Sequence, residues 1–338
     1  MGGLGRDRAG DQSRHGSSSA VGAGAASVDA DFHTLRTPPI PPGQFEMLTL
    51  STLPGAVTGG DVLVAVRGLP ATAALKVSRN GVDVSSVFKR LANGERHGFV
   101  TGLTPGSNAL VATALGRSAT LVVKNHPITG PVISGPHQTP FICRTEDAGL
   151  GKPLDANCSV KTTYRWFYRS IQDQEFHELA DPYAAYPSDA MMTETADGRG
   201  VPFVVRVESS TINRGITRIA LLDDPHARGA GKPFEPSSWD HRVFYLFGES
   251  CGVGYHQGVN LPEYVLGALP LTEISADTLF ATVAGVTDRL AKGDITVHST
   301  LTTFGVHCNA MVSMETAMMI MEYIIERYGP VAAVIGTN

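Results

Sequence analysis

One motif in this chain has the residue types of an acyl-transfer nucleophile. Residues Gly248-Glu249-Ser250-Cys251-Gly252 satisfy the pattern GxSxG, in which a serine on a sharp strand-to-helix turn attacks the carbonyl carbon of an ester. The apolar run Val243–Phe247 just before the motif is typical of a buried strand. The loop can therefore serve catalysis in two ways: it carries the nucleophile at Ser250, or its backbone amides bind the oxyanion that another nucleophile creates.

The residues behind the motif favour the oxyanion role. In an α/β-hydrolase a long helix follows the nucleophile at once, whereas residues 252–262 contain three glycines and a proline, which disfavour a helix. A glycine-rich loop after a central strand is suited to presenting N–H groups to an oxyanion. We therefore predict that Gly248–Gly252 form an oxyanion loop. The alternatives are a purely structural loop, or Ser250 as the nucleophile with His256 or His298 as its base.

The C-terminal residues fit the strand before a nucleophile better. Val331–Ile335 is a short apolar run that follows a long predicted helix and leads into Gly336-Thr337-Asn338. In this fold the acid and the histidine of the triad follow the nucleophile in the chain. We therefore expect all three catalytic residues to lie beyond Asn338, which predicts that the chain as given is inactive.

Four cysteines lie where disulfides would hold loops. Cys143 and Cys158 bracket a loop rich in Gly, Pro and Asp, and Cys251 and Cys308 each follow a predicted strand. Closing a loop of about 15 residues contributes on the order of 3 kcal/mol. We predict the pairs Cys143–Cys158 and Cys251–Cys308, although four cysteines allow three pairings and four reduced thiols are the alternative. Disulfides would indicate a secreted or periplasmic protein, although the N-terminus lacks the apolar stretch of a signal peptide.

Histidines near these loops raise the question of a metal site. His256, His298 and His307 are candidates, but the chain has no HxxxH, HExxH or CxxC spacing, and a cysteine in a disulfide cannot bind a metal. No metal and no cofactor is predicted. A second polar cluster, expected to form a structural ion-pair network, comprises Arg206, Glu208, Arg214 and Asn213.

Composition excludes several classes of partner. The chain has 338 residues, a net charge of −5 and 42% hydrophobic residues. This charge gives no basic surface for nucleic acid, and no apolar run approaches the roughly 18 residues that span a bilayer. The expected partner is a small-molecule or oligomeric ester, and the oligomeric state is open.

Three regions follow one another along the chain. Residues 1–43 are rich in Gly, Ala, Ser and Arg and are predicted to be a disordered leader. Residues 44–127 contain short β patterns about ten residues apart, divided by turns such as Asn80-Gly81, which predict an Ig-like β-sandwich. Seven strands are expected in it, at Met47–Thr52, Asp61–Arg67, Leu75–Arg79, Ser85–Leu91, Gly98–Gly102, Asn108–Ala114 and Ala119–Lys124.

Residues 128–338 alternate strands with helices, which predicts a doubly wound, α/β-hydrolase-like sheet that is incomplete. The expected strands are Thr163–Arg169, Pro202–Ser209, Ile216–Leu222, Val243–Phe247, Ile295–Thr300 and Val331–Ile335, the last of them buried and parallel. Helices are expected near Ser275–Leu290 and at Ala310–Tyr328, where Asn309 is a good N-cap. One apolar stripe at helical spacing is expected to pack in the core, namely Met311, Met314, Met318, Met321, Ile325 and Tyr328.

The order of these segments resembles the DUF6351 family of exported bacterial proteins, related to the tannase/feruloyl esterase and 3-hydroxybutyrate-oligomer hydrolase branch of α/β-hydrolases. The matching stretches include NHPITGP, VPFVVRVESSTINRGITRIALL, FGESCGVGYHQG, FGVHCN and ETAMMIMEYIIERYG. The resemblance implies longer relatives with a Gly-Ser-Gly-Gly elbow just after the segment matching Val334–Gly336. It also implies that Gly248–Gly252 lie on the oxyanion side, where relatives tend to have glycines in place of Glu249 and Ser250.

These observations lead to one hypothesis and two alternatives. The chain is expected to be the N-terminal portion of a secreted serine ester hydrolase that works through an acyl-enzyme. The first alternative is a non-catalytic binding or structural protein on a hydrolase scaffold. The second is an active esterase that uses Ser250.

Overall fold

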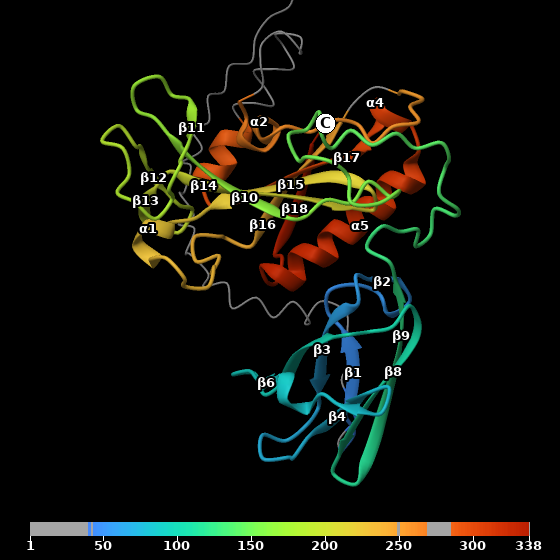
Figure 1. The fold of residues 1–338 in the computed structure, drawn as a ribbon. Helices are drawn as coiled ribbons and strands as arrows, with labels where there is room; N and C mark the ends of the chain where they lie inside the picture. The colour runs from blue at the N-terminus through green and yellow to red at the C-terminus, as the bar shows by residue number, and fades with distance from the viewer. Residues whose placement is uncertain (1–39, 42, 249–250, 269–284, 338) are drawn as a thin grey trace, which may run out of the picture. The chain divides into compact units, whose positions relative to one another are not determined.

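The computed structural model of this protein describes residues 40–41, 43–248, 251–268 and 285–337. The predicted leader therefore lies almost entirely outside the described residues, as do Glu249, Ser250 and most of the helix expected near Ser275–Leu290. Residues 37–338 cluster as one compact unit, in which Figure 1 shows two all-strand layers and a larger sheet with helices.

The first described region is a β-sandwich of a four-stranded and a five-stranded sheet. Alternate residues of each strand point inward and form one apolar core, as Val62, Val64 and Leu110 do. All seven predicted strands overlap an observed one, and only two strands of two residues each were not predicted, β2 (Val57–Thr58) and β5 (Val82–Asp83). The first sheet orders its strands as β1 (Glu46–Thr49), β3 (Asp61–Arg67), β7 (Arg96–Thr101) and β6 (Phe88–Arg90). The second orders them as β2 (Val57–Thr58), β9 (Arg117–His126), β8 (Gly106–Ala114), β4 (Lys76–Arg79) and β5 (Val82–Asp83).

The Asn80-Gly81 turn shows how local chemistry sets the strand register. Both residues have positive φ, 49° and 84°, as a two-residue type I′ hairpin requires. Arg79 pairs with Val82 across the turn. Two short 3-10 helices, η1 (Pro54–Ala56) and η2 (Ser85–Val87), complete this region.

The second region is built on a seven-stranded mixed sheet of order β11-β10-β14-β15-β17-β16-β18. The strands from β11 to β17 pair antiparallel, whereas β16 pairs parallel with both β17 and β18. The strands are β10 (Thr163–Arg169), β11 (Phe176–Glu178), β14 (Val204–Ile212), β15 (Gly215–Leu222), β16 (Arg242–Gly248), β17 (Ile295–Thr303) and β18 (Ala333–Thr337). A small hairpin, β12 (Met192–Glu194) with β13 (Gly200–Pro202), forms a separate two-stranded sheet.

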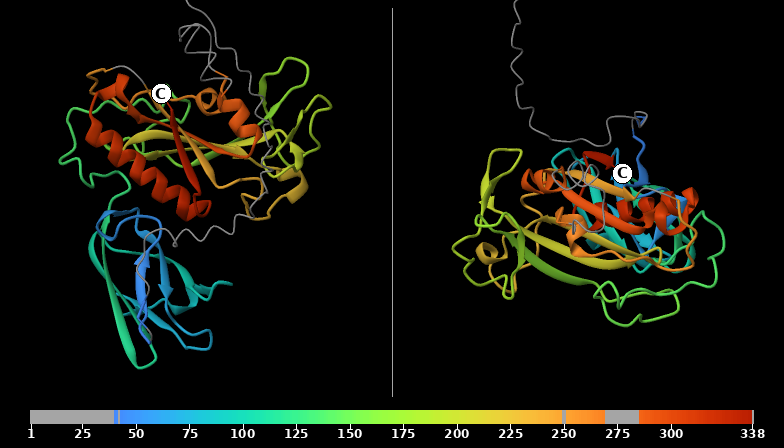
Figure 2. Two further views of the ribbon diagram at one scale, coloured as in Figure 1. Left: turned by 180° about the vertical axis from the view of Figure 1, so that it is seen from behind. Right: turned by 90° about the horizontal axis from the view of Figure 1, so that it is seen from above.

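Helices cover both faces of the parallel part, as the alternation of strands and helices predicts. On β16, Val243 and Tyr245 pack against α5 (Ala310–Arg327), which lies along one face of the sheet (Figure 2). Phe244 and Leu246 point to the other face, against α2 (Pro262–Leu266) and helical residues 285–291. Two single-turn helices are α1 (Pro225–Arg228) and α4 (Phe304–His307).

The predicted apolar stripe of the last helix is confirmed only in part: Tyr328 is buried in the core and Met321 packs against it, but the first two methionines do not. Met311 and Met314 are 47% and 54% exposed, and α5 instead packs its neighbouring face against the sheet through Met319, Ile320 and Ile324. Both faces have apolar residues at helical spacing, so periodicity alone cannot choose between them. The true face is obscured in the sequence because it also contains two buried glutamates, Glu315 and Glu322.

The last strand is parallel as predicted, but it is not buried. β18 pairs only with β16 and is the outermost strand of the described sheet, so Val334 is 51% exposed. An edge strand has a neighbour on one side alone, and its apolar composition does not reveal this.

Glu322 on α5 is a buried acid that pairs with no cation among the residues that the structure describes. Thr58 of β2 donates to it from both its amide (3.0 Å) and its hydroxyl. Burial outweighs these hydrogen bonds and raises the pKa of Glu322 from 4.5 to about 7. One turn later, burial raises the pKa of Glu326 to about 8.

This burial predicts a pH-dependent stability. A carboxyl whose pKa is higher in the folded state stabilises the fold below its unfolded pKa, and that stability is lost as pH rises towards the folded pKa. For Glu322 the window runs from pH 4.5 to about 7, and the loss is on the order of 3 kcal/mol. We expect Glu322→Gln to raise the free energy of unfolding at pH 8 by this amount and to flatten its pH profile.

Urea unfolding from pH 5 to pH 8 measures the effect. Glu194→Gln on strand β12 is the matched control, because Glu194 is an exposed acid, and it should keep the parent slope. A Glu322→Gln profile as steep as that of the parent would contradict the prediction.

Candidate functional site

The carboxyl ends of the parallel strands meet at one edge of the sheet. The chain leaves β16 for β17 on one side of it and then passes through α5 to β18 on the other side. In open α/β sheets such a switch point leaves a crevice in which ligands bind. A pocket of about 300 Å³ lies there. We call it the strand-end pocket; it is lined by Phe247, Gly248, Thr302, Phe304, Ser313, Gly336 and Thr337.

Three glycines of the motif region are required by a close approach of two backbones. A Cβ on Gly248 would lie 2.2 Å from the Thr303 side chain, and one on Gly252 would lie 1.9 Å from the Gly305 carbonyl oxygen. A Cβ on Gly254 would lie 2.6 Å from the Val306 carbonyl oxygen. The glycine content of this loop thus has a packing cause: it lets the loop after β16 lie directly on residues 303–306.

Hydrogen bonds hold the two segments together. The Gly252 amide donates to the Phe304 carbonyl oxygen at 2.8 Å, and the Gly254 amide donates to that of Val306 at 2.9 Å. Because its N–H is used in this way, the Gly252 amide is not a free donor in this structure. Of the other residues of the motif, Gly248 lines the strand-end pocket and Cys251 is exposed. The role of Gly248–Gly252 as an oxyanion loop stays a prediction.

Residues 251–260 form neither helix nor strand, and α2 begins only at Pro262. The glycine and proline content predicted this absence of a helix behind the motif. Ser250 itself lies outside the described residues, so its role stays a prediction.

Both predicted disulfides are present. Cys143 pairs with Cys158, and Cys251 pairs with Cys308. The second bond links the loop after β16 to the segment after α4, beside the backbone contacts at Gly252 and Gly254. Two disulfides are typical of a protein from an oxidising, extracellular or periplasmic compartment.

The candidate histidines His298 and His307 have different surroundings. His298 is buried with its ring stacked on Tyr264 at 5.0 Å, and burial lowers its pKa to about 4. His307 is fixed by the Leu301 carbonyl oxygen, 2.7 Å from Nε2, and by the Asn309 amide, which donates to Nδ1. Within the described residues no three His, Cys, Asp or Glu side chains form a group that could hold a metal ion.

The polar cluster expected around Asn213 divides in two. Arg206 lies over the rings of Tyr164 and Phe234, at 4.1 and 4.0 Å, and 3.6 Å from Glu208. Arg214 belongs elsewhere and lies over the ring of Phe141 at 4.0 Å. The expected single network is therefore wrong in including Arg214.

Arg218, which sequence reasoning missed, holds the loops around the sheet. It is 1% exposed, and its guanidinium donates to the Asn260 carbonyl oxygen at 2.9 Å and to that of Ala148 at 2.7 Å. It also donates to the Ser209 hydroxyl at 2.6 Å. Burial lowers its pKa to about 10. The available signal was an arginine inside the apolar strand sequence ITRIALL.

Gln257 is the second missed residue. Its buried amide donates to the carbonyl oxygens of Cys158 (3.1 Å) and Arg214 (2.9 Å). Its side-chain oxygen accepts from the Arg144 amide at 3.1 Å. Gln257 therefore joins the loop after β16 to the Cys143–Cys158 loop and to the β14–β15 turn.

Comparison with known proteins gives one strong match. A model of a family described as "Tannase-like family of unknown function (DUF6351)" matches residues 47–338. A search of curated proteins found no match.

The similar solved structures share little with the chain. They include a putative membrane anchored protein from Corynebacterium diphtheriae, with a TM-score of 0.21, 11% identity and coverage of 50% of this chain and 31% of that one. The I9-I11 tandem from titin has a TM-score of 0.18, 12% identity and coverage of 52% and 61%. Tandem Ig repeats of Dlar have a TM-score of 0.19, 16% identity and coverage of 48% and 87%. The chain thus spans less than two thirds of the length of the first two of these solved structures. The β-sandwich of residues 44–127 is therefore identified from its own strand pairing.

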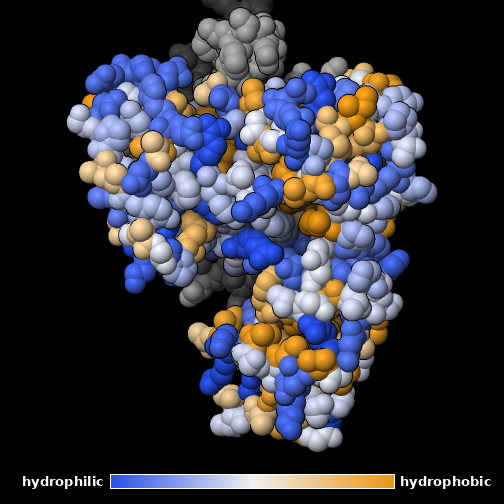
Figure 3. Space-filling view, viewed as in Figure 1, coloured by the Kyte–Doolittle hydropathy of each residue, from blue (hydrophilic) through white to orange (hydrophobic). Residues whose placement is uncertain are grey.

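The surface and the helices were compared with what a membrane protein requires. On the face shown in Figure 3, hydrophobic residues are interspersed with hydrophilic ones. Among the described residues, no helix combines the length and the apolarity needed to cross a membrane.

Proposed function

Because the chain belongs to the tannase-like family DUF6351, we propose that its strand-end pocket binds the acyl part of a carboxylic ester for hydrolysis. The observation that carries this proposal is the position of the pocket, at the switch point where β16, β17 and β18 end. The proposed fold of residues 128–338 is α/β-hydrolase-like, with the sandwich at residues 44–127 as a separate domain.

The loop after β16 forms the oxyanion side of the proposed site. Attack on an ester carbonyl puts negative charge on its oxygen, and preorganised N–H groups stabilise that charge. The Gly252 and Gly254 amides already donate to the carbonyl oxygens of Phe304 and Val306. The proposed donors to the oxyanion are therefore the amides of Gly248 and of residues 249–251. Loss of one such donor typically costs about 3 kcal/mol of transition-state stabilisation.

Ser250 is not the nucleophile in this proposal. A nucleophile elbow needs a helix directly behind the serine, and residues 251–260 have none. The two disulfides support export of the protein.

Binding of an ester analogue tests the pocket. Acetanilide, the amide analogue of phenyl acetate, should shift backbone amide resonances in a ¹H–¹⁵N spectrum of the whole chain at the pocket. We expect Gly336→Val to weaken this binding at least tenfold, because a Cβ there lies 3.2 Å from the Phe247 ring and narrows the pocket. Gly200→Val on β13 is the control, since a Cβ at Gly200 meets nothing within 4 Å, and it should bind like the parent.

Two results would count against the proposal. Acetanilide shifts at residues away from the strand ends, or equal binding by Gly336→Val and Gly200→Val, would show that the strand-end pocket is not the binding site. Fluorophosphonate labelling of the parent that disappears in Ser250→Ala would show that Ser250 is the nucleophile of an active esterase, and that the proposed oxyanion role of its loop is wrong.

A further inference from the structure

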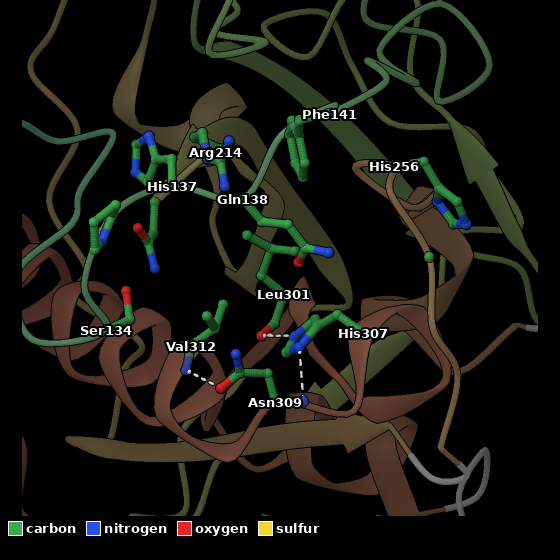
Figure 4. Close-up of a pocket in the computed structure, with 13 residues that line it drawn as sticks. Ser134, His137, Gln138, Phe141, Arg214, His256, Leu301, His307, Asn309 and Val312 are labelled. Atoms are coloured by element: carbon green, nitrogen blue, oxygen red, sulfur yellow. Dashed lines mark hydrogen bonds between the residues drawn. The ribbon is translucent and has the colours of Figure 1, made fainter.

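A second pocket lies away from the strand ends and is lined by polar side chains that the proposed hydrolysis does not use. It has a volume of about 70 Å³. Figure 4 shows Arg214 between His137 and Phe141 on one side of it, and His307, Asn309 and Val312 on the other. We call it the arginine pocket.

Several polar groups around this pocket are already satisfied. Both ring nitrogens of His307 have hydrogen-bond partners, and the Asn309 side chain caps α5 by accepting from the Met311 and Val312 amides. Asn213 donates to the Thr316 hydroxyl at 2.9 Å. The His307 ring, Asn309 Oδ1 and Asn213 Nδ2 are therefore already used within the protein.

Two buried nitrogens remain without a partner among the described residues, Arg214 Nε and His137 Nε2. Arg214 is only 9% exposed, and the Phe141 ring fixes its guanidinium. Its backbone has a φ of 68°, next to Asn213 at 51°, which is the conformation that a two-residue turn between the paired Ile212 and Gly215 requires. The hairpin turn and the Phe141 ring therefore hold this arginine in place.

In the described part of the chain Arg214 makes no direct ion pair, and Glu315 is the acid that attracts its charge. The nearest acid is Glu315, whose carboxylate accepts from the backbone amides of Val132, Ile133 and Ser134 and from the Ser134 hydroxyl. These four donors already satisfy that carboxylate. A buried guanidinium without a partner is unfavourable, and a bound anion would relieve it.

The size of the pocket limits that anion. On this measure one water needs at least about 10–15 Å³, so the pocket holds about five water-sized groups. A carboxylate with one or two further carbons has this size. Of its two oxygens, one would accept from Arg214 Nε and the other from His137 Nε2 once that nitrogen is protonated, and a charge-assisted hydrogen bond from arginine to carboxylate is among the strongest that proteins form.

We propose that the arginine pocket binds a small aliphatic carboxylate, such as acetate, between Arg214 Nε and His137 Nε2. The proposal does not rest on the ester-hydrolase function, because none of the residues that line this pocket lines the strand-end pocket.

Binding also involves a proton. The His137 ring is bonded to the Thr129 carbonyl oxygen, and since Nε2 has no partner, Nδ1 makes this bond and carries the proton. Neutral Nε2 is then an acceptor, so it can meet a carboxylate oxygen only after taking up a proton from solvent. The titratable and charged groups around His137 are Arg214, Glu315, His256 and His307.

Titration of the whole chain with sodium acetate, by calorimetry in buffers of different ionisation enthalpy, tests the proposal. We expect saturable binding with uptake of one proton and a Kd that falls about tenfold from pH 8 to pH 7. Arg214→Gln should raise the Kd at least tenfold, and His137→Gln should make binding independent of pH. Arg169→Gln, an arginine that also lies over phenylalanine rings, is the control and should bind like the parent.

The following results would overturn the proposal. They are the absence of saturable acetate binding to the parent, an unchanged Kd in Arg214→Gln, and a proton uptake that persists in His137→Gln. Phosphate or benzoate binding as tightly as acetate would overturn the assignment to a small carboxylate. If Arg214→Gln does not fold, as circular dichroism would show, the His137→Gln titration decides alone.

Discussion

Replacing Cys251 and Cys308 together with serine is expected to lower the free energy of unfolding by about 4 kcal/mol. The bond closes a segment with a sequence separation of 57 residues, and removing it returns that conformational freedom to the unfolded chain. The same change at Cys143 and Cys158, with a separation of 15 residues, should cost about 3 kcal/mol.

Guanidinium unfolding of both double variants measures these losses, and each serves as the control for the other. Hydrogen exchange separates a local effect from a global one. In the Cys251→Ser/Cys308→Ser variant the Gly252 and Gly254 amides, which are bonded to Phe304 and Val306, should exchange faster than the sheet. A loss below 1 kcal/mol in this variant, or unchanged protection of these two amides, would contradict the expectation.

Arg218→Met should destabilise the protein by a similar amount, on the order of 4 kcal/mol. Methionine fills much of the volume but leaves three buried acceptors without a donor, namely the carbonyl oxygens of Asn260 and Ala148 and the Ser209 hydroxyl. An unsatisfied buried acceptor typically costs 1–3 kcal/mol. Both loops that Arg218 holds should become mobile together.

The matched control is Arg169→Met, because Arg169 lies over the rings of Phe176 and Phe203 and is only half-buried. It should cost about 1 kcal/mol or less. Urea unfolding of the two variants side by side gives the comparison, and equal losses would show that Arg218 has no special structural role.

The sequence predicted those features whose cause is local. Asn80-Gly81 needs only its own backbone preferences to form a hairpin, and Asn309 needs only the next three amides to cap α5. The longer strands of both regions, the parallel pairing of β18 and both disulfides also follow from patterns along the chain, whereas short strands such as β11 and β12 were not predicted.

The features that were missed depend on residues far apart in the chain. The buried face of α5 is chosen by the sheet and by Thr58, 264 residues before Glu322, so the methionines could not reveal it. Arg218 and Gln257 act through carbonyl oxygens, which every residue has, and no sequence motif identifies such partners. The hydrogen bond of the Gly252 amide could not be predicted either, because its acceptor, Phe304, lies 52 positions later.

The contact of Gly248, Gly252 and Gly254 with residues 303–306 leaves no room for even one methyl group. Evolution can therefore change these positions only in concert. A homologue that has a side chain at Gly252 or Gly254 must have a different backbone path in the facing segment, whereas one at Gly248 needs a smaller residue at position 303. Substitutions in the two segments should covary, and the glycine spacing should be inherited together with the length of the facing segment.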